Sequence, residues 1–143
     1  MSNLKVFNAT RGQCLCGQIK YELNGEVSSF HLCYCSRCRH STGSAHAANV
    51  FTKPEAIKWI CGEEQIKRFE LAQAKSFAKQ FCQNCAGAVP YLNKAGTFLV
   101  VPAGSLVDEI EFGPDDRIFT DSKAKWTECI FELPTFERYP DKF

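Results

Sequence analysis

Apolar and polar residues alternate in several short stretches of the chain, a pattern typical of β-strands that are buried on one face. Turn-forming residues separate these stretches, and helical periodicity is weak between them. The pattern therefore predicts a mainly β domain built from short strands. The predicted strands are 19–23, 29–32, 46–51, 57–60, 66–69, 76–81, 88–92 and 97–101.

Four segments outside these strands carry local turn or loop signals. Asn24-Gly25 predicts a turn after the first strand, and residues 62–64 predict a hairpin between the strands on either side. The Gly-Pro-Asp-Asp sequence at 113–116 is a further turn signal. The small polar residues 41–44 predict a loop or the start of a helix.

Length and composition fit one ordinary globular domain that spans residues 1–143. The chain is 45% hydrophobic and 23% charged, and a domain of this length can bury a real core. Its formal net charge of +1 gives no broad field that would attract nucleic acid or an anionic membrane. The N-terminus lacks the apolar stretch of a secretory signal, and no apolar run is long enough to span a bilayer, so we expect a cytoplasmic protein.

Seven of the nine cysteines fall into three closely spaced groups. Reducing conditions in the cytoplasm keep thiols free unless a metal binds them, and an odd number of cysteines disfavours a complete disulfide framework. The spacings are those of zinc knuckles, in which a tight turn lets two thiolates reach one ion. The groups are Cys14-x-Cys16, Cys33-x-Cys35-x-x-Cys38 and Cys82-x-x-Cys85.

Seven thiols divide naturally into four and three. A structural zinc takes four protein ligands, whereas a catalytic zinc takes three and leaves one position for water or substrate. The favoured grouping joins the two separated pairs on one closed zinc and leaves the central triplet as an open site, where zinc can bind a thiolate or polarise a carbonyl oxygen. A rival grouping joins Cys14 and Cys16 to two thiols of the triplet, which leaves Cys82 and Cys85 without enough partners.

Motifs along nearly the whole chain resemble the glutathione-dependent formaldehyde-activating enzyme family, which includes centromere protein V. Three positions differ from the family pattern: Tyr34 and Arg117 stand where His is usual, and Ala86 stands where Gly is usual. The matching motifs are Gly12-x-Cys14-x-Cys16-Gly17, Cys33-x-Cys35-x-x-Cys38-Arg39 followed by Gly43, Phe81-Cys82-x-x-Cys85, Val101-Pro102-Ala103-Gly104-Ser105-Leu106, and Ser122-Lys123-x-x-Trp126.

The resemblance implies a fold, two zinc ions and an activity. The fold is a β-tent of short antiparallel strands. The resemblance places a structural zinc on Cys14, Cys16, Cys82 and Cys85, and a catalytic zinc on Cys33, Cys35 and Cys38. It implies carbon–sulfur lyase or synthase chemistry on an adduct such as S-hydroxymethylglutathione, with glutathione and formaldehyde as small-molecule partners. The alternative is a non-catalytic zinc protein that binds glutathione or another small thiol.

A few residues outside the thiol groups are candidates for substrate contact or for packing. Arg39 follows the triplet and could pair with a substrate carboxylate, while Lys123 and Trp126 could form the lip of a site for a peptide-like ligand. Cys61 and Cys129 lack partners at knuckle spacing, and we expect them to be buried in the core.

Two further expectations concern histidine and phenylalanine. His46 could approach the open zinc, although support of a ligand or simple packing is the more common role of such a residue. The 12 phenylalanines are expected to fill the core of the sheet.

Overall fold

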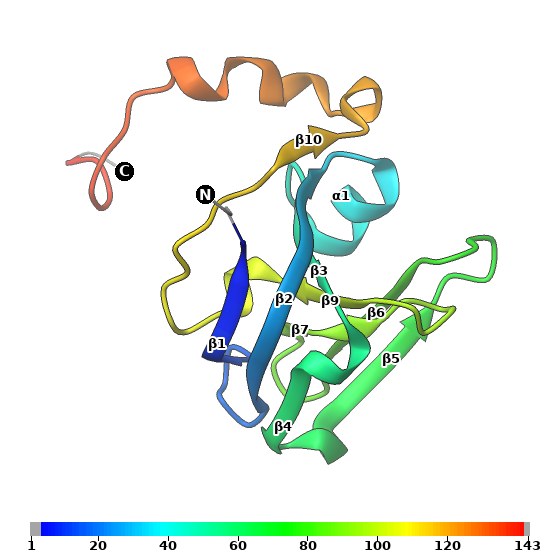
Figure 1. The fold of residues 1–143 in the computed structure, drawn as a ribbon. Helices are drawn as coiled ribbons and strands as arrows, with labels where there is room; N and C mark the ends of the chain where they lie inside the picture. The colour runs from blue at the N-terminus through cyan, green and yellow to red at the C-terminus, as the bar shows by residue number, and fades with distance from the viewer. Residues whose placement is uncertain (1–3, 142–143) are drawn as a thin grey trace.

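The computed structural model describes residues 4–141 and shows a mainly β protein with curved sheets and one short α-helix (Figure 1). Each predicted strand is present at least in part. The strands are β1 Val6–Gln13, β2 Lys20–Cys33, β3 Ala47–Thr52, β4 Ile57–Cys61, β5 Ile66–Glu70, β6 Ala78–Cys82, β7 Ala88–Val89, β8 Tyr91–Leu92, β9 Leu99–Pro102 and β10 Asp116–Ile118. The helix is α1 Ser36–Thr42, and the 3-10 segments are η1 Pro54–Ala56, η2 Glu63–Gln65, η3 Ala103–Ser105, η4 Thr120–Ser122 and η5 Lys125–Glu132.

Strand β2 organises the larger sheet. The first half of β2 pairs with β1 and β4, and its second half pairs with β3 and β10. From β3 the sheet continues through β9 to β8, while β5, β6 and β7 form a separate antiparallel sheet. The β2–β10 pairing is parallel, which is an exception to the antiparallel arrangement expected from the sequence.

The core lies against the larger sheet. Its central side chains are almost completely buried, and full burial of one such apolar side chain stabilises the fold by about 1.5–3 kcal/mol. The Tyr21 hydroxyl is buried next to Ser105 and shares a hydrogen bond with its hydroxyl, so this polar group is satisfied within the core. The core side chains include Phe7, Tyr21, Leu23, Phe30, Val50, Leu99 and Val101.

The turn predicted at Asn24-Gly25 is wrong. β2 runs through both residues, and Gly25 adopts a φ of 122° while it pairs with Phe7 of β1. β1 itself was not predicted, because a bulge between Phe7 and Thr10 interrupts its alternation of buried and exposed residues.

The predicted hairpin and the turn at 113–116 are also wrong. β4 pairs with β2, whereas β5 pairs with β6, so the two strands around residues 62–64 join different sheets. At 113–116 the chain stays extended, since Asp115 exchanges hydrogen bonds with the backbone of Phe30 and Asp116 begins β10.

Helix α1 ends where the sequence suggested a loop or a helix start. Gly43 follows Thr42 in the left-handed conformation with a φ of 65°, and its N–H donates to the carbonyl of Arg39. This is a glycine C-cap, so residues 41–44 close the helix. Among residues 4–141, no helix has the length and apolar character needed to cross a membrane.

The expectation that the phenylalanines fill the core is wrong for several of them. Phe69, Phe98, Phe119, Phe131 and Phe136 are exposed. The last two belong to the C-terminal segment, which runs along the top of the molecule beyond β10 and ends away from the sheets (Figure 1).

Candidate metal centres

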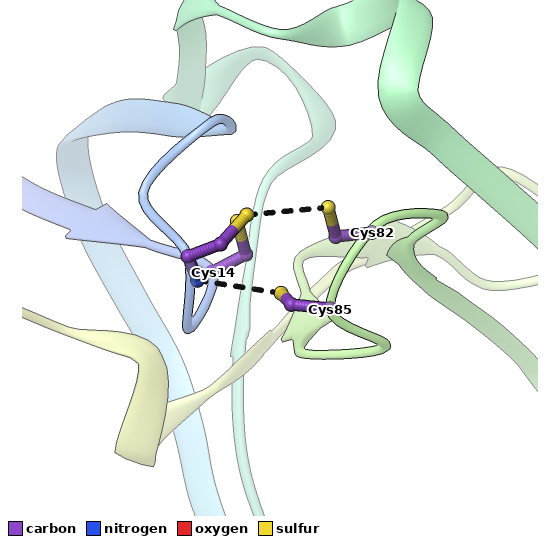
Figure 2. A group of neighbouring side chains, drawn as sticks. Cys14, Cys82 and Cys85 are labelled. Carbon is purple, nitrogen blue, oxygen red and sulfur yellow. Dashed lines mark hydrogen bonds between the residues drawn. The ribbon is translucent and has the colours of Figure 1, made fainter.

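Four thiols from two distant turns form the first cluster. Cys14 and Cys16 lie in the turn that joins β1 to β2, while Cys82 ends β6 and Cys85 lies in the turn before β7. Their sulfur atoms all lie within 4.8 Å of one another. Figure 2 shows Cys14 facing Cys82 and Cys85 across the gap between the two turns. The cluster therefore joins the larger sheet to the smaller one.

The sulfur separations fit a tetrahedral metal. The Sγ atoms of Cys14 and Cys16 are 3.7 Å apart, and those of Cys16 and Cys82 are 3.9 Å apart. A tetrahedron with zinc–sulfur bonds of about 2.3 Å has edges of about 3.8 Å. Four thiols at this spacing match the donor set and the size of a closed structural zinc site.

Backbone amides stabilise the charged form of these sulfurs. The N–H groups of Cys16 and Gly87 donate to the Sγ of Cys85, and that of Ile19 donates to the Sγ of Cys14, each at 3.4 Å. A hydrogen bond from the Asn84 side chain is the main reason that the pKa of Cys16 falls to about 6. Hydrogen bonds from backbone amides likewise lower the pKa of Cys85, whereas burial raises that of Cys14. The surroundings therefore favour the thiolate, the form in which cysteine binds metal, at Cys16 and Cys85.

Close backbone approach at Gly87 lets the two turns meet. A Cβ at Gly87 would lie 2.8 Å from the backbone nitrogen of Leu15 and 3.2 Å from the Sγ of Cys85, so only glycine fits without a shift. Ala86 adopts a φ of 62°, the left-handed region that favours glycine. The Ala86 departure from the family pattern is thus accommodated with some backbone strain.

The central triplet forms the second cluster. Cys33 ends β2, Cys35 is the N-cap residue of α1, and Cys38 lies in the first turn of that helix. The N–H of Cys38 donates to the Sγ of Cys35 at 3.4 Å, which is the hydrogen bond that caps the helix. All three sulfurs lie within 4.8 Å of one another, with Cys33 and Cys38 buried and Cys35 partly exposed. The structure thus groups the thiols as four and three, and not in the rival arrangement.

A cleft of about 530 Å³ opens next to the triplet. Arg37 and Lys75 supply positive charge, and no carboxylate lines the cleft within the described part of the chain. His31, also in the lining, is paired with Asp116. The remaining lining side chains include Phe51, Phe77 and Ile118 on the apolar side and Asn49, Gln73 and Asn93 on the polar side.

The substrate contacts predicted from the sequence are not part of this cleft. Arg39, Lys123 and Trp126 are absent from its lining. Trp126 is 61% exposed on η5, and the Nε of Arg39 is buried without a hydrogen-bond partner among the described residues. Arg37 and Lys75 were missed, because neither carries a local motif that separates it from an ordinary surface charge.

Tyr34 and Arg117, the two other residues that differ from the family pattern, also lie outside the lining of the cleft. Tyr34 is buried and packs against the ring of His46, with the ring centroids 5.0 Å apart. The Nδ1 of His46 is buried without a hydrogen-bond partner in residues 4–141. Arg117 is exposed on β10.

The expectation that Cys61 and Cys129 are buried is wrong. Both thiols are exposed. Cys61 ends β4, where its Sγ donates to the carbonyl of Gln18, and Cys129 lies in η5. Alternation around Cys61 suggested a buried strand, but the end of β4 faces solvent.

Comparisons with known proteins agree with this architecture. The sequence model described as glutathione-dependent formaldehyde-activating enzyme matches residues 9–122. Among solved structures, the chain is similar to the crystal structure of a Rhodobacter sphaeroides protein, a Northeast Structural Genomics target, with 18% identity and a TM-score of 0.58 over 75% of this chain and 98% of that chain. This likeness concerns the fold alone. No curated protein matches the chain.

Proposed function

Because the chain belongs to the glutathione-dependent formaldehyde-activating enzyme family, we propose that it is a zinc-dependent carbon–sulfur lyase or synthase. Its substrate would be a thiol adduct such as S-hydroxymethylglutathione, made from or returned to glutathione and formaldehyde. The observation that carries this proposal is a cluster of only three thiols beside a cleft with cationic side chains.

Two zinc ions per chain suit the two donor sets. Cys14, Cys16, Cys82 and Cys85 would hold a structural zinc, and Cys33, Cys35 and Cys38 would hold the second with one position open. When bound at the triplet, zinc supplies a Lewis acid that can hold a thiolate or polarise an aldehyde oxygen.

The side chains of the cleft would bind and orient the thiol. Arg37 and Lys75 can pair with the carboxylates of glutathione at the cleft wall. Phe51 and Phe77 would exclude water from the sulfur, and the Tyr91 hydroxyl can donate a hydrogen bond to the oxygen of the aldehyde or adduct. Holding both reactants in one orientation raises the rate by lowering the entropic cost of their encounter.

The reaction is an addition that balances without a further reactant. A bond forms between the thiol sulfur and the aldehyde carbon, and the carbonyl double bond becomes a single bond. The thiol proton ends on the oxygen. In the lyase direction the carbon–sulfur bond breaks, and the hydroxyl proton returns to sulfur.

A second candidate is a protein that binds glutathione or another small thiol without catalysis. The lack of a carboxylate in the described lining favours it, since such a group could accept and return the proton. Calorimetry that finds glutathione binding, together with an exchange rate no faster than in buffer, would select this candidate.

The cytoplasm is the compartment we propose for either function. All nine thiols of the chain are free, and metal binding requires that the seven clustered thiols stay reduced.

The test of the leading function is the rate of exchange between formaldehyde, glutathione and their adduct, measured with and without the protein. A faster rate with protein is expected.

A further inference from the structure

The cleft beside the triplet has a cationic rim and a mainly apolar floor. The cationic side chains Arg37 and Lys75 are exposed, the first in α1 and the second in the loop between β5 and β6. Arg37 lies between Cys35 and Cys38 in the chain, and Lys75 is two residues before Phe77, which packs against the triplet. The carboxylates of a thiol bound at the triplet would therefore stay at this rim.

The floor is one face of the larger sheet. Side chains two residues apart on a strand point to the same face, so Ala47, which pairs with Cys33, shares its face with Phe51. Phe51 pairs with Val100 of β9, which pairs in turn with Tyr91 of β8, and these three side chains line the cleft. From Ala47 to Phe51 the strand advances about 13 Å, so the floor extends well beyond the thiols.

Apolar side chains lie at both ends of this floor and are not fully covered. Phe77 and Ile118 pack against the triplet, and Phe51 packs at the far end, yet all three are only half-buried. A polar row, His31 and Asn49, lies between the two ends. The cleft therefore offers apolar surface both beside the reacting atoms and some distance away from them.

Formaldehyde would leave this apolar surface in contact with water. Its single carbon carries only hydrogen, and the charged groups of glutathione pair with the cations of the rim. On the basis of the function proposed above, we infer that the adduct joins the thiol to an aldehyde with an apolar side chain, in preference to formaldehyde. The reaction keeps its balance: the sulfur bonds to the aldehyde carbon, the carbonyl double bond becomes single, and the thiol proton ends on the oxygen.

Rates with a series of aldehydes test this preference. Zinc-loaded protein receives glutathione with formaldehyde, propanal or hexanal, and each kcat/KM is divided by the rate constant of the same reaction in buffer. This ratio removes the differences in intrinsic reactivity among the aldehydes. We expect it to rise about fourfold for each methylene that the floor buries, and at least about tenfold from formaldehyde to hexanal.

Binding of inert thioethers gives a second measurement that needs no turnover. S-Hexylglutathione should bind at least about tenfold more tightly than S-methylglutathione in calorimetry. Phe51→Ala should reduce this difference. Phe98→Ala is the matched control, because its ring lies 5.9 Å from that of Phe51 between centroids but does not line the cleft, and it should keep the difference. Circular dichroism checks that both variants are folded.

The outcomes separate this inference from the function on which it rests. An acceleration that is equal across the series, or greatest with formaldehyde, would overturn the apolar preference and leave the lyase or synthase function in place. Equal binding of the two thioethers would also overturn the preference alone. No acceleration with any of the aldehydes would remove the function, and the preference with it.

Discussion

The sulfur of Cys16 lies 3.9 Å from the sulfur of Cys82, although 66 positions separate the two residues in the chain. One thiol belongs to the turn before β2 in the larger sheet, and the other ends β6 in the smaller sheet. Since this separation is close to the edge of a zinc–thiolate tetrahedron, about 3.8 Å, we expect a metal to be the main link between the sheets.

Replacing a thiol of this cluster should destabilise the whole fold. Cys82→Ser is expected to lower the free energy of unfolding by about 4 kcal/mol and to remove one zinc per chain, because metal binding and folding are coupled. Thermal unfolding and elemental analysis of the purified variant measure both effects.

Cys61→Ser is the matched control for that experiment. Its thiol is exposed at the end of β4 and belongs to neither cluster, so stability should stay within about 0.5 kcal/mol of wild type. If Cys82→Ser were as stable as Cys61→Ser, the four-thiol cluster would not be a structural metal site.

Replacing a thiol of the triplet should separate activity from stability. Cys35→Ser is expected to keep one zinc and a cooperative thermal transition while losing the exchange activity, because Cys35 is partly exposed and only caps a helix of seven residues. Zinc content, circular dichroism and exchange kinetics measure the three properties. Loss of fold in Cys33→Ser, with Cys82→Ser still folded, would contradict the proposed division of roles.

A methyl group at Gly87 should weaken the four-thiol cluster although none of the four thiols is replaced. The added Cβ would collide with the backbone of Leu15, so Gly87→Ala is expected to cost about 1–3 kcal/mol and to speed the loss of zinc to a chelator. Gly104→Ala is the control, since nothing lies within 4 Å of its added Cβ. Equal chelator kinetics in the two variants would show that the close approach is not needed.

Removing the positive charge of the cleft should weaken thiol binding more than turnover. Arg37→Met/Lys75→Met is expected to raise the KM for glutathione about tenfold, or about 1.4 kcal/mol, with little change in kcat. Lys53→Met/Lys58→Met removes two exposed charges outside the cleft and controls for the change in net charge. An equal KM in both double variants would remove Arg37 and Lys75 from the proposed binding site.

Local signals predicted the thiol groups and most strands, but not which strands pair. The spacing of Cys14, Cys16, Cys82 and Cys85 indicated the four sulfurs that the structure brings together, because each closely spaced pair supplies two ligands and a tetrahedral metal site needs four. Pairing depends on distant partners, so residues 62–64 looked like a hairpin although β4 and β5 belong to different sheets. No local signal in the sequence indicates which distant strand each of them pairs with.

The lining of the cleft does not follow from helical spacing alone. Arg39 is four residues after Cys35 and so lies on the same side of α1 as that thiol, yet Arg37 lines the cleft and Arg39 does not. Lys75 lies far from the triplet in the chain, and only the fold brings it near.

The most direct measurement of the central claim is the rate at which formaldehyde, glutathione and S-hydroxymethylglutathione exchange, followed by NMR at equilibrium with zinc-loaded protein. Our account predicts a faster exchange with wild-type protein and the rate of buffer alone with Cys35→Ser. Equal rates for wild type, Cys35→Ser and buffer would contradict it.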